Sequence, residues 1–314
     1  MRILKNTSPD VVSDVYEAIR EEFVTGNPAL NGILGRVFST PGKGARPLFM
    51  EMIARKNGGG WGSIRKAATA VEAVHIASLL HDDVVDGSKM RRGETTLHTQ
   101  YSDKISILFG DYVFIKAIMI THSIENSEVV RVIQDAVRRM IEGEIRDSLC
   151  IGLLEEDAYY SIIRDKTASL FAAAGEAGII LTGGGTRERS WARDIGEAVG
   201  MAFQIIDDTL DFQGDASVMG KSVLMNLRGG FPTLPIIHAL RGCDEDEVKR
   251  MLPCGEGSTD RLLAVVRERG GLEYAQERAH GFIRKGRELL EYFGDGDSDG
   301  EFSRFFDMIV ARRA

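Results

Sequence analysis

Two groups of aspartates are the residues of this sequence best suited to chemistry. Each has the pattern Asp-Asp-x-x-Asp within a helical segment: Asp82, Asp83 and Asp86 in HDDVVD, and Asp207, Asp208 and Asp211 in IDDTLD. The first and last aspartates of each group are four residues apart, so they lie one turn apart on the same helix face. We call these groups the first and second aspartate rows.

Both rows interrupt apolar stretches, VEAVHIASLL before the first and GMAFQII before the second. Carboxylates on a core-facing helix are costly unless a cation pairs with them, and like charges four residues apart repel each other. Oxygen ligands favour hard cations, and Mg²⁺ is typically bound by one or two carboxylates together with substrate phosphates. Two such rows facing each other would hold Mg²⁺ and a diphosphate. A solvated acidic helix face is the alternative.

Several basic residues near the rows could bind the rest of the diphosphate charge, which Mg²⁺ alone does not balance. They are Lys43 and Arg46 in PGKGARP, Arg91 and Arg92 in SKMRRG, Lys166 in RDKTASL, and Lys221 in MGKS. The PGKG turn leads into a helix, where backbone amides also bind phosphate. His75 lies seven residues before Asp82 on nearly the same face, with a core histidine as the alternative. Each basic residue alone would be interpreted as a surface charge. The prediction that they bind diphosphate rests on their grouping around the two aspartate rows.

Helices are the elements that must position these residues. Apolar residues recur at three and four positions in five long segments, 63–85, 102–123, 128–150, 157–181 and 188–212. Glycine-rich breaks separate the helices, at 41–44, 57–60, 182–185 and 227–232. No linker or composition shift divides the chain. The pattern predicts one all-α domain over residues 1–314, a bundle of about a dozen helices, and helical bundles build their substrate sites in the interior.

Composition and charge narrow the possible functions. The chain has 314 residues, 43% of them hydrophobic and 27% charged, as in soluble globular proteins. A net charge of −8 argues against nucleic acid as the main partner. Its three cysteines are widely spaced and show no zinc-ligand pattern. The apolar stretch 105–120 is interrupted by Asp111 and Lys116 and falls short of the ~20 apolar residues of a spanning helix. We expect a cytoplasmic protein without a transmembrane segment or signal peptide.

Over nearly its whole length, the sequence resembles the trans-isoprenyl (polyprenyl) diphosphate synthases. The resemblance rests on motifs in the family's order: GKGARP, HIASLLHDDVVD, MRRGETTLH, GDY, KTASL, FQIIDDTLDF, MGKS and TLP. It implies the isoprenoid synthase type of fold, a helical bundle around a central catalytic cavity, and a homodimer. It also implies a prenyltransferase that condenses isopentenyl diphosphate onto an allylic diphosphate, geranyl or farnesyl diphosphate, and releases diphosphate.

The resemblance implies a role for each candidate residue. The six aspartates of the two rows look like the Mg²⁺ ligands. The resemblance implies that the isopentenyl diphosphate site is formed by Lys43, Arg46, His75 and Arg92. It implies that the allylic diphosphate is bound by Arg91, Lys166 and Lys221. Lys166 is also a predicted catalytic residue. Thr167 and Gln204 look like neighbours that steady the developing carbocation.

The sequence departs from the family's pattern in two places. Gly44 stands where the family often has Arg. After the second row the family usually has Asp-Leu and then Glu-Gly-Lys, whereas this chain reads Asn226-Leu227 and then Gly229-Gly230-Phe231. The departures predict one fewer phosphate contact and a weaker diphosphate site after the second row. Activity is still expected because all six aspartates and Lys221 are present.

Small residues before the first row bear on product length. Ser78 and Ala77 lie four and five residues before Asp82 on the same side of the helix. A bulky residue there would stop chain growth, since one isoprene unit is about as long as a helical turn, ~5 Å. The resemblance therefore implies a product of roughly six to eight or more units. The alternative is that these residues only allow close helix packing. Phe114, Ile118 and Met119 are candidates for the tunnel floor.

Other functions fit part of the same residue pattern. Terpene cyclases and head-to-head synthases share the aspartate-rich chemistry but do not need a second diphosphate site. A short-chain farnesyl or geranylgeranyl diphosphate synthase, or a subunit of a heteromeric synthase, are further alternatives. DGDSDGEF at 295–302 resembles the start of a calcium-binding EF-hand loop, with Asp295, Asp297 and Asp299. Its twelfth position is Phe306 instead of Glu, which favours a solvated acidic turn.

Overall fold

The computed structural model describes residues 10–91, 93–149, 155–210, 212, 232–243, 248, 258–292, 297 and 300–311. Almost all regular structure in these ranges is helical, so the predicted all-α class is confirmed. The chain forms two compact units, Met1–Val137 with Leu170–Arg193, and Arg138–Ser169 with Asp194–Ala314. We call them unit 1 and unit 2. The single domain over residues 1–314 stays a prediction.

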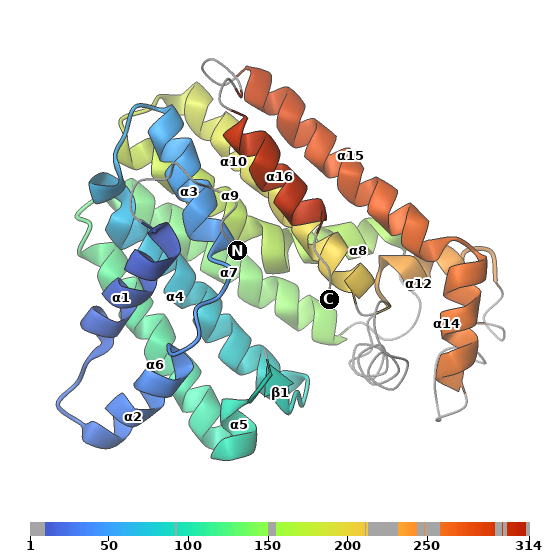
Figure 1. Cartoon of the computed structure of the whole chain (residues 1–314), viewed down its shortest axis with the longest axis horizontal. Helices are drawn as coiled ribbons and strands as arrows, with labels where there is room; N and C mark the ends of the chain where they lie inside the picture. The colour runs from blue at the N-terminus through green and yellow to red at the C-terminus, as the bar shows by residue number, and fades with distance from the viewer. Residues whose placement is uncertain are drawn as a thin grey trace. The chain divides into compact units, whose positions relative to one another are not determined.

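Unit 1 contains the helices of the N-terminal part of the chain. They are α1 (Val11–Phe23), α2 (Pro28–Val37), α3 (Ala45–Lys56), α4 (Trp61–Val85), α5 (Leu97–Gln100), α6 (Asp103–His122) and the first part of α7 (Ser127–Leu149). The C-terminal segments of the unit lie in α9 (Ser169–Leu181) and α10 (Thr186–Leu210). Helix α4 packs against α1, α3 and α6, and Figure 1 shows α4 and α6 side by side.

Helices α4 and α6 are in close contact at Gly110 and Ser106. A Cβ at Gly110 would come within 2.3 Å of His81 Nε2, so the His81 side chain lies directly against the backbone of α6. The Ser106 hydroxyl donates to the Leu80 carbonyl at 3.0 Å, and Ser106 is fully buried. A buried hydroxyl needs such a partner. These contacts fix the turn of α4 that carries the first aspartate row.

Unit 2 contains α8 (Glu156–Ile163), a π-helical turn (Arg164–Ala168) and the later part of α10. The remaining helices are α12 (Leu234–Ala239), α14 (Ser258–Glu268), α15 (Gly271–Glu291) and α16 (Glu301–Val310). One apolar cluster of this unit joins residues of α12 and α14, among them Ile236, Ala239 and Leu262. In Figure 1, α15 and α16 run side by side, in agreement with their contacts.

The five predicted long helices are present, with ends within about two residues of the prediction. The prediction for 157–181 missed that α8 and α9 are joined by the π-helical turn. The predictions also missed a short antiparallel hairpin of β1 (Met90–Arg91) and β2 (Glu94–Thr95), in which Met90 pairs with Thr95. Gly93, which lies in the turn of this hairpin, has φ +80°, a conformation that favours glycine.

Candidate active site

The first aspartate row ends α4. Asp82 is half-buried, Asp83 is buried and Asp86, the residue that caps the helix, is exposed. The Asp86 amide donates to the Asp82 carbonyl at 2.8 Å, so the backbone of the row is still helical. The row therefore offers Asp82 and Asp86, one turn apart, as the more accessible carboxylates.

Asp83, the middle aspartate, pairs with Arg91 of β1. Arg91 Nε lies 2.7 Å from Asp83 Oδ1. Burial raises the pKa of the Asp83 carboxyl, and the nearby Arg91 charge offsets part of that effect. The hairpin that carries Arg91 is tied back by His98, whose Nε2 lies 2.8 Å from the Ser88 carbonyl oxygen. Arg91 was predicted to clamp the allylic diphosphate, and in this structure it neutralises Asp83.

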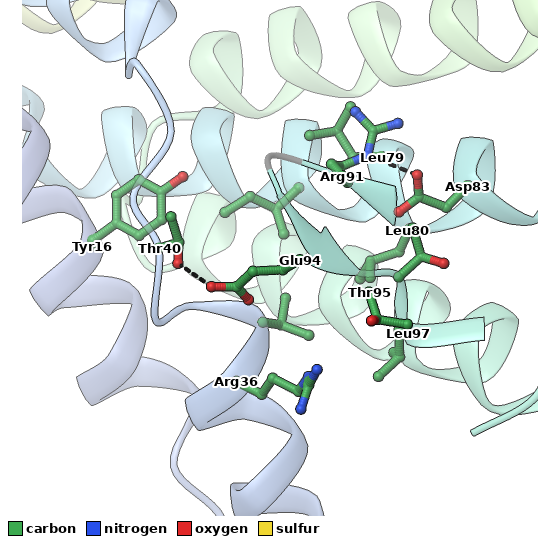
Figure 2. Close-up of a pocket in the computed structure, with 13 residues that line it drawn as sticks. Tyr16, Arg36, Thr40, Leu79, Leu80, Asp83, Arg91, Glu94, Thr95 and Leu97 are labelled. Carbon is green, nitrogen blue, oxygen red and sulfur yellow. Dashed lines mark hydrogen bonds and ion pairs between the residues drawn. The ribbon is translucent and has the colours of Figure 1, made fainter. Parts of the chain in front are cut away.

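A small pocket lies beside this ion pair, in unit 1 (Figure 2). The Asp83–Arg91 pair lines it together with Thr40 and Glu94, which are joined by a hydrogen bond of 2.9 Å. The face of α4 that carries Leu79 and Leu80 supplies apolar lining. Asp82 and Ser78 do not line this pocket. Of the residues predicted to bind the metal, the pocket therefore contains Asp83 but not Asp82, and neither Ala77 nor Ser78 lines it.

Predicted isopentenyl diphosphate ligands also lie in unit 1. Arg46 is only 5% exposed, and its guanidinium lies 4.6 Å from the centre of the Phe171 ring. Lys43 is exposed, in the loop before α3, and His75 is half-buried on α4. The loop is held by Tyr16, whose hydroxyl accepts the Gly42 amide at 2.7 Å.

The Gly44 departure has a structural reason. Gly44 has φ +58°, the left-handed conformation that side chains disfavour. A Cβ there would lie 2.7 Å from Val12 Cγ2 of α1. An arginine does not fit this backbone conformation and packing. Glycine at position 44 therefore allows α1 to pack against the start of α3.

The second aspartate row lies at the end of α10, in unit 2. Asp207 is half-buried and Asp208 is 7% exposed. The Gln204 amide donates to Asp208 Oδ1 at 2.8 Å, and the Thr167 hydroxyl donates to Gln204 Oε1 at 2.7 Å. Three predicted site residues, Thr167, Gln204 and Asp208, are thereby connected by hydrogen bonds.

Tyr159 of α8 completes this network, and the sequence patterns did not single it out. Its hydroxyl donates to Asp208 Oδ2 at 2.6 Å, and its side chain is fully buried. Burial and the nearby Asp208 charge raise the pKa of Tyr159 well above its ordinary value, so the phenol remains a donor. Its only sequence signal is a tyrosine in a helix near Lys166, which is too weak to predict a role.

Lys166 lies in the π-helical turn, a form often found at functional sites. Its ammonium lies 2.7 Å from Glu144 Oε2 and 2.5 Å from Asp147 Oδ2, both on α7. The neighbouring Asp165 pairs with Arg139 of α7 at 2.8 Å. Glu144 and Asp147 are further residues that the sequence patterns missed, since contacts between two helices leave no local spacing to detect.

Some predictions fall outside the described residues and are not placed. These are Asp211, Arg92 and Lys221 among the site residues, and Asn226, Gly229, Gly230 and Phe231 among the departures. Among the residues that are described, no cluster of three or more metal-binding side chains is formed. The donors of the rows are nevertheless all carboxylate oxygens, and Asp82 and Asp207 are not fully buried. This donor set fits Mg²⁺, which takes one or two carboxylates and completes its shell with water and phosphate.

The residues predicted to set product length differ in exposure. Ala77 is fully buried, whereas Ser78 is half-buried and donates its hydroxyl to the His75 carbonyl at 2.9 Å. Ser78 is therefore the one with space beside it. Of the candidate floor residues, Phe114 and Ile118 are half-buried, but Met119 is 59% exposed. Within this chain Met119 faces outward, which argues against its placement at a tunnel floor.

Of the aspartates in the acidic turn before α16, the structure describes Asp297, while Asp295 and Asp299 lie outside the described residues. Asp297 accepts the amides of Phe302 and Ser303 at 2.9 and 2.8 Å, at the start of α16. Phe306 is fully buried. A carboxylate that binds the first amides of a helix stabilises it. These contacts support the acidic-turn interpretation over a calcium loop.

Helix α6 is long and apolar enough to cross a membrane, judged by length and composition alone. Less than half of the most apolar stretch of this helix is buried. Core helices of soluble proteins pass the same test, so this is weak evidence for a span.

Comparison with known proteins agrees with the residue pattern. The chain is 32% identical over 302 residues to the octaprenyl diphosphate synthase of Haemophilus influenzae, covering 94% of this chain and 92% of that protein. Its structure is similar to that of a polyprenyl synthase from Caulobacter crescentus complexed with calcium and isoprenyl diphosphate, with a TM-score of 0.88, 31% identity and coverage of 96% and 94%. It also resembles a decaprenyl diphosphate synthase from Rhodobacter capsulatus, with a TM-score of 0.87, 32% identity and 96% coverage of both chains. The sequence model of the Polyprenyl synthetase family matches residues 27–267, and the chain belongs to that family.

Proposed function

We propose that this protein is a trans-prenyltransferase that extends an allylic diphosphate with isopentenyl diphosphate and makes a polyprenyl diphosphate of medium or long chain. One observation carries the proposal. Both aspartate rows and their basic neighbours lie inside the region matched to the Polyprenyl synthetase family. The octaprenyl and decaprenyl diphosphate synthases among the similar proteins favour a long product over a short one.

Mg²⁺ is the proposed cofactor, held by the aspartates of the two rows. The calcium in the Caulobacter crescentus structure supports a divalent cation in this family. Bound there, Mg²⁺ would stabilise negative charge on the leaving diphosphate. Among the aspartates that the structure describes, the accessible carboxylates are Asp82 and Asp86 of the first row and Asp207 of the second.

The chain's own residues have distinct tasks in the proposed reaction. Lys166 binds the allylic diphosphate and stabilises the charge that develops as the allylic carbon–oxygen bond breaks. Glu144 and Asp147 hold its ammonium in place before substrate arrives. Thr167 and Gln204, joined by a hydrogen bond, are the proposed neighbours that stabilise the developing allylic cation. The double bond of isopentenyl diphosphate attacks the cation, and a proton is then lost to the departing diphosphate.

Arg46, Lys43 and His75, together with Arg92, form the proposed isopentenyl diphosphate site, and Arg91 and Lys221 join Lys166 on the allylic diphosphate. Arg46 is the most restricted of these, because its guanidinium lies over the Phe171 ring and the residue is buried. Such restriction lowers the entropy lost when phosphate binds. Ser78, with space beside it, would line the path of the growing chain.

We also propose a homodimer. The exposed side of α6 carries Leu108, Ile115 and Met119, which are 54%, 54% and 59% exposed. Their spacing places them on one helix face. An exposed apolar stripe of this kind is typical of a surface that a second copy covers.

The test is a product assay with purified protein, Mg²⁺, labelled isopentenyl diphosphate and farnesyl diphosphate. The proposal expects a ladder of prenyl diphosphates that ends at roughly six or more units. Incorporation that ends at geranylgeranyl diphosphate would overturn the chain length alone. No incorporation with any allylic primer would overturn the reaction.

A further inference from the structure

We propose that Tyr159 is a positioning residue of the second aspartate row, and that its hydroxyl holds the Asp208 carboxylate in the orientation that binds the divalent cation. The inference rests on the proposed function, which assigns Asp208 to the cation. Tyr159 lies outside both aspartate rows and outside the basic motifs, on α8.

The geometry fixes the carboxylate from two sides. Tyr159 donates to Oδ2 at 2.6 Å, and Gln204 donates to Oδ1 at 2.8 Å. The first distance is in the range of charge-assisted O–H···O⁻ bonds, which are shorter and stronger than neutral ones. Because each oxygen has its own donor, the carboxylate cannot rotate about its Cβ–Cγ bond without breaking a hydrogen bond. Carboxylates that bind metals are commonly oriented in this way by neighbouring donors.

Tyr159 is itself held firmly. Its side chain is fully buried, and its ring lies edge-on to that of Tyr160 at 5.6 Å between centroids. Helix α8 begins at Glu156, which accepts the Tyr274 hydroxyl of α15 at 2.8 Å and pairs with Arg241 at 2.6 Å. These contacts fix the helix, and through it the position of the Tyr159 hydroxyl.

The neighbouring tyrosine provides a matched control. Tyr160 is on the same helix and is 8% exposed, but its hydroxyl donates to Glu156 at 2.6 Å and accepts from Arg278 at 2.9 Å. Tyr159→Phe and Tyr160→Phe each remove one hydroxyl that donates to a carboxylate. Only the first of these carboxylates belongs to an aspartate row.

The experiment measures cation binding directly. Mn²⁺ is titrated into the full-length protein with inorganic pyrophosphate, and free Mn²⁺ is followed by electron paramagnetic resonance. Tyr159→Phe is expected to weaken Mn²⁺ binding about 10- to 100-fold, the usual effect of removing a group that orients a metal ligand. Tyr160→Phe is expected to bind as the wild type does. Mg²⁺ and pyrophosphate should also raise the melting temperature of each protein above its own value without ligand. We expect this rise to be smaller for Tyr159→Phe than for the wild type and Tyr160→Phe.

A double variant shows whether Tyr159 acts through Asp208. In an Asp208→Asn background, Tyr159→Phe should cause no further loss of Mn²⁺ affinity, because its acceptor charge is already gone. Wild-type affinity in Tyr159→Phe, or independent losses in the double variant, would overturn the proposal. If Tyr159→Phe does not fold, the Mn²⁺ affinity of the Asp208→Asn variant tests the proposal instead. Wild-type affinity in Asp208→Asn would overturn it, because Tyr159 would then have no cation ligand to position. A wild type that binds Mn²⁺ with pyrophosphate but does not elongate would count against the proposed function only.

Discussion

Gly143 of α7 lies directly against the backbone of Lys166. A Cβ at position 143 would come within 2.6 Å of the Lys166 amide nitrogen and 3.0 Å of its Cα. Backbone atoms cannot turn aside as the end of a flexible side chain can. Helix α7 therefore approaches the π-helical turn because residue 143 has no side chain, and the same approach brings Glu144 and Asp147 to the Lys166 ammonium.

Gly143→Ala should therefore lower activity and stability together. Alanine usually stabilises a helix interior by about 1 kcal/mol relative to glycine. Here the added methyl must push the π-helical turn away, at a cost of about 1–3 kcal/mol. We expect a lower kcat and a lower free energy of unfolding in urea. Gly62→Ala is the control, because position 62 of α4 has open space for a Cβ. Equal behaviour of the two variants would contradict the packing argument.

Features that repeat along one helix could be predicted from the sequence, and features that depend on contacts between helices could not. The ends of α4, α6, α7 and α10 follow from apolar periodicity and glycine breaks. Tyr159 and Asp147 show the limit. Each contacts a site residue of another helical segment at 2.6 Å or less, and neither has a spacing that marks it. The π-helical turn was missed because its residues continue the helical pattern on both sides.

Removing one accessible aspartate from either row should stop turnover without unfolding the protein. We expect Asp82→Ala and Asp207→Ala to lower kcat by at least about 10²–10³-fold, as when one stabilising group is removed from a developing anion. Their melting temperatures without metal should stay near that of the wild type. Asp157→Ala, at an exposed position of α8, is the control. Near-normal turnover in either row variant would overturn the assignment of that row.

Ser78→Phe should shorten the product. Ser78 is half-buried and Ala77 fully buried, so a phenyl ring at 78 can enter existing space. Ala77→Phe would overpack the core and cost about 1–3 kcal/mol in addition. Chromatography of the extracted prenyl products should show a shorter ladder for Ser78→Phe, with kcat for the first condensation kept. An unchanged ladder would remove this face of α4 from the elongation path. Ser63→Phe, at an exposed position of the same helix, controls for the added ring.

A charge on the exposed face of α6 should separate the dimer. Ile115 is 54% exposed, so a lysine there is tolerated in a single chain but not under a second copy. We expect Ile115→Lys to sediment as a monomer under conditions in which the wild type is a dimer. Val24→Lys changes another exposed apolar residue, 67% exposed at the end of α1, and should leave the dimer intact. A wild type that sediments as a monomer would overturn the homodimer itself.

Glu156 should make the stability of unit 2 depend on acidic pH. Burial raises the pKa of its carboxyl, but hydrogen bonds from Tyr160 and Tyr274 and the charges of Arg278 and Arg241 outweigh burial, so the pKa lies below its ordinary value of 4.5. A depressed folded pKa stabilises the protein above the unfolded pKa, and that stability is lost as the pH falls through the folded pKa. The loss therefore begins near pH 4.5 and continues downward.

Glu156→Gln removes this dependence. At pH 7 the variant should be less stable than the wild type by about 1–3 kcal/mol, because the amide replaces a charged acceptor of several hydrogen bonds. Below pH 4.5 the difference should shrink, since the wild-type carboxylate becomes protonated as well. Urea denaturation at a series of pH values measures both effects, with Glu155→Gln, at the exposed neighbouring position, as the control. A difference that stays constant as the pH falls would show that the Glu156 charge does not stabilise these contacts.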